Sequence, residues 1–139
     1  MICVVNTEPI AKGRPRFVKR GKFVQTYTPK KTLDYETIIK KEFIKQCEGE
    51  YNSEYTGAID VRITFFFAPP KSISKKKKEQ LIGTPHLKKP DTDNLAKAIL
   101  DALNGTAWKD DSQIFLLTIE KQYNENNQVF IKINYKEGE

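Results

Sequence analysis

Residues 91–105 have the sequence Asp-Thr-Asp-Asn-Leu-Ala-Lys-Ala-Ile-Leu-Asp-Ala-Leu-Asn-Gly, which is the strongest structural signal in the chain. Its apolar residues recur at the spacing of a helix that buries a single stripe. They are Leu95, Ala98, Ile99, Ala102 and Leu103. The helix is predicted to run from about Asp93 to Asn104 and to stop at Gly105. We expect the apolar stripe to pack against a β-sheet.

The polar residues of this helix are also periodic. Asp93, Lys97 and Asp101 follow one another at intervals of four residues and share a second face. Asp91 comes directly after Pro90, where the chain enters from an extended conformation. Asp91 and Asp93 can therefore direct oxygen atoms toward one point at the start of the helix.

A second acidic pair, Asp110 and Asp111, lies in the loop before the next predicted strand. This loop has to fold back along a helix about 18 Å long if Asp111 is to approach Asp93. Two carboxylates about 4 Å apart repel by about 4 kcal/mol at an effective dielectric of about 20, so three converging aspartates would be costly without a cation. Oxygen ligands suit Mg²⁺, with Mn²⁺ as a substitute.

Helix capping is the alternative interpretation of Asp91 and Asp93. Aspartates are common at helix N-termini because they accept hydrogen bonds from free N–H groups and complement the helix dipole. Asp110 and Asp111 could equally form a solvated turn. The spacing alone leaves open whether the carboxylates converge.

The remaining elements are short and separated by turn-forming residues. A helix is predicted over Thr32–Cys47, with Leu33, Ile38, Ile39 and Phe43 near one face. A short helix capped by Ser72 or Ser74 is expected within residues 71–83. Strands are predicted over residues 1–6 and 58–67; hairpins are predicted over residues 17–27, around residues 20–22, and over residues 114–135, around residues 124–127. The prediction is one α+β domain, residues 1–139, in which a mixed sheet packs against two main helices.

The charge of the chain is unevenly distributed. The net charge is +6, yet residues 91–111 hold five aspartates against two lysines. An acidic island in a basic protein is typical of an enzyme that uses a cation to act on a polyanion. No apolar run approaches the roughly 20 residues that cross a bilayer. Two cysteines and a single histidine make a zinc site an unfavoured alternative.

Residues 88–105, followed by Trp-Lys-Asp-Asp-Ser-Gln-Ile at 108–114, resemble the signature of the RusA-type Holliday junction resolvases. Weaker similarity covers residues 9–17 and 27–29. The resemblance implies a small homodimeric, Mg²⁺-dependent endodeoxyribonuclease of bacteria, phages or prophages that cuts four-way DNA junctions in recombination and repair. It also implies a cytoplasmic protein with branched DNA as its partner.

The resemblance assigns roles to individual residues. Asp91 and Asp93 match the paired active-site aspartates, Asp111 matches the third carboxylate, and Lys97 matches the essential lysine. The choice of Asp111 over Asp110 stays open. Asp101 also fits the motif and is a further candidate site residue, with a structural role such as pairing with Lys97 as the favoured alternative. Phosphate contacts are expected from Lys12, Arg14, Arg16, Lys19, Arg20, Lys88 and Lys89, with Lys22 and Lys75–Lys78 as further candidates.

Two other functions fit the same residues. One is a metal-dependent nuclease that acts on flaps or other branched DNA, because no feature of the sequence encodes junction geometry. The other is a non-catalytic basic DNA-binding module whose aspartates only cap a helix. Trp108 and Phe65–Phe67 are expected in the core or in dimer contacts rather than in base stacking.

Overall fold

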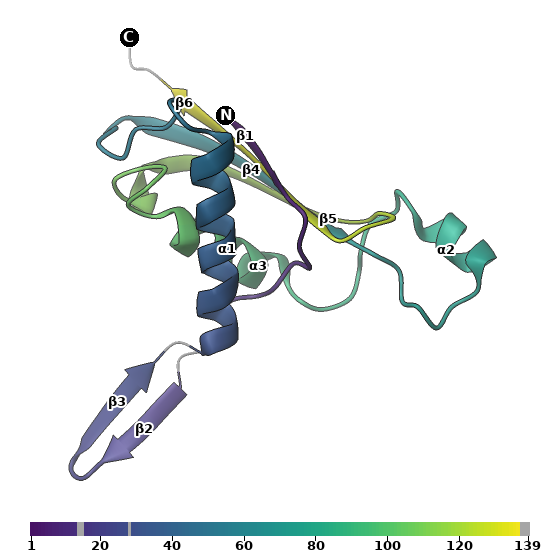
Figure 1. The fold of residues 1–139 in the computed structure, drawn as a ribbon, viewed down its shortest axis with the longest axis horizontal. Coiled ribbons are helices and arrows are strands. Elements are labelled where there is room, and N and C mark those ends of the chain that lie inside the picture. Colours follow the sequence, from purple (N-terminus) through teal and green to yellow (C-terminus); the bar gives the residue numbers. More distant parts are fainter. Residues whose placement is uncertain (14–15, 28, 137–139) are drawn as a thin grey trace.

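The computed structural model describes residues 1–13, 16–27 and 29–136. A four-stranded sheet forms the body, and a separate two-stranded hairpin projects beyond one end of the long helix α1 (Figure 1). The strands are β1 (Ile2–Val5), β2 (Arg16–Arg20), β3 (Phe23–Tyr27), β4 (Ala58–Phe67), β5 (Ile114–Tyr123) and β6 (Gln128–Lys136). The helices are α1 (Lys30–Gln46), α2 (Lys75–Leu81), α3 (Thr92–Leu103) and the 3-10 turn η1 (Asp111–Gln113).

The sheet has the strand order β1-β6-β4-β5. Strand β4 runs antiparallel to β6 and parallel to β5, so the predicted mixed sheet is confirmed. The predicted hairpin between residues 114 and 135 is wrong, because β4 lies between β5 and β6. Residues 124–127 cross the end of β4, where Asn124 N donates to Phe67 O and Ala68 N donates to Asn127 Oδ1. Four residues suffice to span two inter-strand spacings, about 10 Å.

Strand β4, which lies between β6 and β5, contributes one apolar face to the core. Its residues Ile59, Val61, Ile63 and Phe65 are fully buried. Trp108, Phe65 and Phe67 are buried, as predicted, whereas Phe66 is only half-buried. Cys3 and Cys47 are buried free thiols, and burial raises the pKa of Cys3 to about 12.

Helix α3 has its predicted stripe in the core. Leu95, Ala98, Ile99, Ala102 and Leu103 are all buried, together with Ala96. Gly105 follows the helix with a φ of 79°, a left-handed conformation that glycine adopts without strain.

Helix α1 buries a different face from the one predicted. Its buried residues are Thr32, Tyr35, Ile39 and Phe43. Leu33 remains 49% exposed and Ile38 is also exposed, so their assignment to the buried face is wrong. The true stripe includes a threonine and a tyrosine, which a count of aliphatic residues overlooks.

The short helix α2 stands apart from the sheet (Figure 1). Ser74 Oγ accepts a hydrogen bond from Lys77 N and caps it, which settles the choice between Ser72 and Ser74. The described residues thus form three α-helices, of which α1 and α3 are the long ones. None of the helices in the described residues combines the length and apolarity that a membrane span needs.

Replacing Ile99 should show how far the fold depends on α3. Ile99→Ala removes a fully buried side chain and should lower the free energy of unfolding by about 2–5 kcal/mol. Leu33→Ala, on the exposed face of α1, should change it by only about 0.5 kcal/mol. Urea denaturation followed by circular dichroism measures both, and equal losses would contradict the assigned core.

Candidate active site

A hollow of about 210 Å³ lies between α3 and β5. Four residues predicted from the sequence line it together: Asp93, Lys97, Asp101 and Asp111. Its apolar lining consists of Ala96, Leu100, Leu117 and Ile119. Asp91 is not part of this lining. The hollow follows α3 from residue 93 to 101, which is about 12 Å of helix.

Asp91 occupies the N-cap position of α3. Its backbone is extended, and its carbonyl accepts a hydrogen bond from Leu95 N, as at any helix start. Its side chain makes no capping hydrogen bond and is exposed. The carboxylate of Asp91 therefore accepts none of the hydrogen bonds that the capping alternative assigns to it.

Asp110 and Asp111 have different environments. Asp110 caps η1 in a reciprocal capping box with Gln113, and its Oδ2 accepts a hydrogen bond from Ser112 N at 3.1 Å. These hydrogen bonds to Ser112 lower the pKa of Asp110 below its usual value. Asp111 is exposed and lines the hollow. The geometry thus separates a structural carboxylate from one that is available for a ligand.

Gln113 fixes the turn that carries Asp111. Its Oε1 accepts hydrogen bonds from Lys109 N and Asp110 N, while its Nε2 donates to Tyr55 O and Gly57 O. One amide thereby ties the turn to the loop before β4.

The chain that leads into Asp91 is held against β5. Gly83 N and His86 N donate to backbone carbonyls of β5. Lys121 Nζ donates to Lys88 O and to Pro90 O, the latter at 2.8 Å. The ammonium of Lys121 therefore fixes the backbone directly before Asp91, beyond the cis peptide bond between Lys89 and Pro90.

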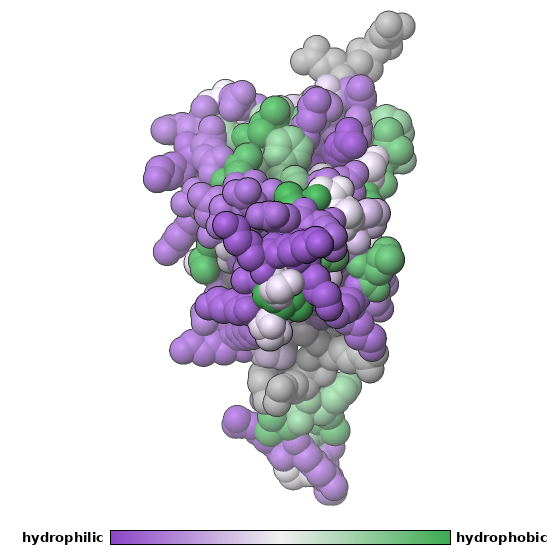
Figure 2. All heavy atoms as spheres, turned by 90° about the vertical axis from the view of Figure 1, so that its right-hand side faces the viewer, coloured by the Kyte–Doolittle hydropathy of each residue, from purple (hydrophilic) through white to green (hydrophobic). Residues whose placement is uncertain are grey.

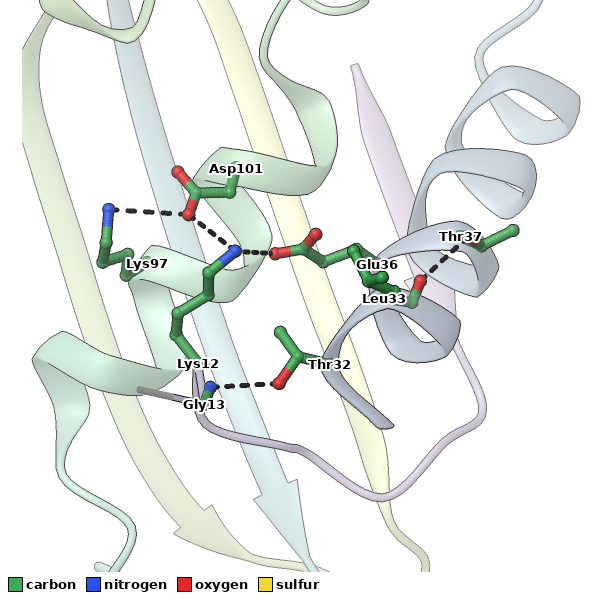
Figure 3. Close-up of polar contacts among 8 residues, drawn as sticks. All are labelled: Lys12, Gly13, Thr32, Leu33, Glu36, Thr37, Lys97 and Asp101. Carbon is green, nitrogen blue, oxygen red and sulfur yellow. Dashed lines mark hydrogen bonds and ion pairs between the residues drawn. The ribbon is translucent and has the colours of Figure 1, made fainter. Parts of the chain in front are cut away.

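Lys12 links the N-terminal arm to both long helices. Its Nζ lies 2.5 Å from Glu36 Oε1 on α1 and 3.1 Å from Asp101 Oδ2 on α3 (Figure 3). Lys97 Nζ lies 3.5 Å from the same Asp101 oxygen, so the pairing of Asp101 with Lys97 is confirmed. Burial alone would lower the pKa of Lys12, but the hydrogen bonds to Glu36 and Asp101 outweigh it and raise the pKa.

Backbone hydrogen bonds dock the same arm. Lys12 N donates to Asn94 O at 3.0 Å, and Gly13 N donates to Thr32 Oγ1 at 3.0 Å (Figure 3). A Cβ at position 13 would lie 2.7 Å from that hydroxyl oxygen, so this close approach requires glycine.

The residues predicted to contact DNA differ in what the structure describes of them. Lys19, Arg20, Lys88 and Lys89 are exposed. Arg14 and the side chain of Arg16 lie outside the described residues. The charge of Lys12 is balanced by Glu36 and Asp101, which favours a structural role over a phosphate contact. Lys22 is exposed at the hairpin turn, and Lys75–Lys78 form most of α2.

Carboxylate oxygens are the kind of ligand that a magnesium ion prefers, but the side chains do not yet surround a common point. Within residues 1–13, 16–27 and 29–136, no group of three or more His, Cys, Asp or Glu side chains lies close enough to hold a metal. Mg²⁺ usually takes one or two carboxylates and fills its other positions with water and substrate phosphate. Asp93 and Asp111 offer two exposed carboxylates on one hollow, and Asp91 lies two residues before Asp93, so the residues present fit such an ion in their chemistry.

Comparison with known proteins places the chain in a family. Residues 6–134 match the family model described as endodeoxyribonuclease RusA. The chain belongs to the RusA family. It is also 33% identical over 132 residues to the uncharacterized protein YqaN of Bacillus subtilis (strain 168), covering 91% of this chain and 89% of YqaN. Membership of the RusA family implies endodeoxyribonuclease activity, in agreement with the resemblance of residues 88–105.

Sequence reasoning overlooked three residues that position the site of this RusA-family chain: Glu36, Gln113 and Lys121. Each of them contacts a residue that is distant in sequence or contacts backbone atoms, and such contacts produce no periodic pattern in the sequence. Only Gln113 had a local signal, because a Gln three residues after an Asp is the pattern of a capping box.

His86, in the segment that leads into Asp91, should make the stability of the fold sensitive to acid. Its buried ring stacks on Phe67 at 4.0 Å, and burial, together with the charges of Lys121 and Lys88, lowers the pKa of His86. Because the unfolded chain then binds a proton more readily, stability should fall as pH drops below about 6.5. His86→Phe should remove this part of the decline. Urea denaturation at pH 7.5 and 5.5 tests it, and an unchanged pH dependence would refute the prediction.

Proposed function

We propose that this chain is a magnesium-dependent, structure-selective endodeoxyribonuclease that resolves four-way (Holliday) junctions by paired symmetric nicks. The observation that carries the proposal is the hollow in which Asp93, Asp111 and Lys97 meet on a RusA-family chain. Its partner would be branched DNA in recombination or repair.

Asp91, Asp93 and Asp111 would hold the cation, with Mn²⁺ as a substitute for Mg²⁺. Asp111 is preferred to Asp110 because the latter is engaged in capping η1. When bound, the cation supplies Lewis-acid activation of a phosphate oxygen and of water. In the described structure, the side chain of Asp91 makes no capping hydrogen bond, and neither Asp93 nor Asp111 forms an ion pair. These exposed carboxylates can therefore rotate toward one ion.

Lys97 would act on the substrate itself. Lys97 lies one helical turn after Asp93, and its side chain is 62% exposed. Its Nζ forms an ion pair with Asp101 at 3.5 Å. From that position its ammonium can bind a non-bridging phosphate oxygen and stabilise the negative charge that grows during in-line attack. The products would be a 5′-phosphate and a 3′-hydroxyl.

One cleavage experiment tests the function. Labelled four-way junction, flap and linear duplex are incubated with Mg²⁺ or with EDTA. Paired symmetric nicks in the junction alone, only with Mg²⁺, are the expected result. Cleavage of flaps in preference to junctions would favour a general branched-DNA nuclease, and binding without cleavage would favour a non-catalytic module.

Matched aspartate variants test the site. Asp91→Asn and Asp111→Asn should each slow junction cleavage by more than about 100-fold, because a lost ligand removes several kcal/mol of transition-state stabilisation. Both should keep junction binding and the wild-type melting temperature. Asp110→Asn is the control and should cut normally, since asparagine caps about as well as aspartate. A slow Asp110→Asn beside a fast Asp111→Asn would reverse the assignment.

We also propose that the enzyme is a homodimer formed through β5. This strand is at the edge of the sheet, and Phe115, Leu116 and Leu117 are exposed there. The segment around Pro85 pairs with β5 only near Gln122. An open edge with apolar side chains favours pairing with another strand, and two-fold pairing of β5 would match the symmetry of a junction.

Leu116→Glu should separate the protomers, because burying an unpaired carboxylate at the interface is unfavourable. Sedimentation velocity should show a shift from dimer to monomer, while Leu33→Glu on the exposed face of α1 should stay dimeric. A monomeric wild type, or a dimeric Leu116→Glu variant, would exclude this interface.

A further inference from the structure

The β2–β3 hairpin exposes large apolar side chains far from the core. Phe17 is 72% exposed, Phe23 is 79% exposed, and Val24 is exposed beside them. In Figure 2 the hairpin is at the bottom of the view, where hydrophobic and hydrophilic surface lie side by side. A two-stranded hairpin without a covering layer is only marginally stable in water, so an apolar surface on it indicates a partner.

Cations and aromatic rings share the faces of this hairpin. Residues opposite each other in the register lie on the same face, and Arg20 pairs with Phe23. Phe17 and Lys19 lie two residues apart and therefore on the other face, where Lys19 pairs with Val24. Each face thus presents an apolar ring next to a positive charge.

The sequence around the hairpin carries only positively charged side chains. Residues 9–33 contain eight Lys or Arg residues and no Asp or Glu. Such a segment attracts a polyanion and repels a second copy of itself. Apolar rings gain nothing from phosphates, however, so they require a different part of a nucleic acid.

The arm that precedes the hairpin is bonded close to the candidate active site. The arm that leads into β2 is bonded to α3 through Lys12 N and Asn94 O, next to Asp93. Lys12 Nζ also binds Asp101, which lines the hollow. A strand of five residues is about 16 Å long, which is comparable with the width of a DNA groove.

We propose that the β2–β3 hairpin inserts Phe17 and Phe23 against unstacked bases at a DNA branch point, while Lys19 and Arg20 bind the flanking phosphates. Base faces are covered in a continuous duplex and accessible where strands exchange. Proteins bend and open DNA by such apolar wedges, and stacking of a base on an aromatic ring is sequence-tolerant. The inference rests on the proposed function and gives it a means of selecting branched over linear DNA.

The test compares Phe17→Ala/Phe23→Ala with the control Ile2→Ala, which removes an exposed apolar residue on β1. Binding is measured in EDTA to a four-way junction and to a linear duplex of the same sequence, with 2-aminopurine at the crossover. The double variant should bind the junction at least about tenfold more weakly and the duplex unchanged. The change in 2-aminopurine fluorescence seen with wild-type protein should disappear. Ile2→Ala should behave as wild type.

The remaining outcomes overturn the proposal in different ways. Equal losses on junction and duplex would indicate a groove contact, and a change in sedimentation of the double variant would indicate a protein interface. If the wild type nicks junctions with Mg²⁺ and the double variant binds junctions as tightly as the wild type, base insertion is rejected and the proposed nuclease function stands. A wild type that neither binds nor nicks junctions would reject both. The melting temperature should be unchanged, since both rings are exposed.

Discussion

A helix packed on a sheet buries one stripe, and the packing of α3 determines where its polar residues lie. Leu95, Ala98 and Ile99 are in the core, which leaves the face at 93, 97 and 101 along the edge next to β5. The same packing sets the distance that the following turn must cover to bring Asp111 to the hollow. The candidate site thus depends on hydrophobic burial on the opposite side of one helix.

Local patterns explain what could be predicted. The extent of β4, the stripe of α3 and the β2–β3 hairpin are encoded in residues that lie within one element or one turn. The prediction that Asp101 pairs with Lys97 was correct for the same reason, because i,i+4 neighbours meet on any helix. The shared hollow of Asp93 and Asp111 agrees with an expectation that came from family resemblance rather than from spacing.

The errors concern contacts between distant segments. The loop 124–127 has the length of a hairpin turn, and only the insertion of β4 reveals that β5 and β6 are not neighbours. The buried face of α1 was misassigned because Thr32 and Tyr35, rather than Leu33 and Ile38, meet the core. The different environments of Asp110 and Asp111 depend on dihedral angles and hydrogen bonds, which adjacent identical residues do not encode.

Asp101 Oδ2 forms ion pairs with two ammonium groups, that of Lys12 at 3.1 Å and that of Lys97 at 3.5 Å. One negative charge is thereby divided between a residue of the arm and a residue of the helix. Both ion pairs use the same carboxylate oxygen. The N-terminal arm and the lysine beside the hollow are consequently joined through a single carboxylate, so a displacement of Lys12 would alter the negative charge that Asp101 presents to Lys97.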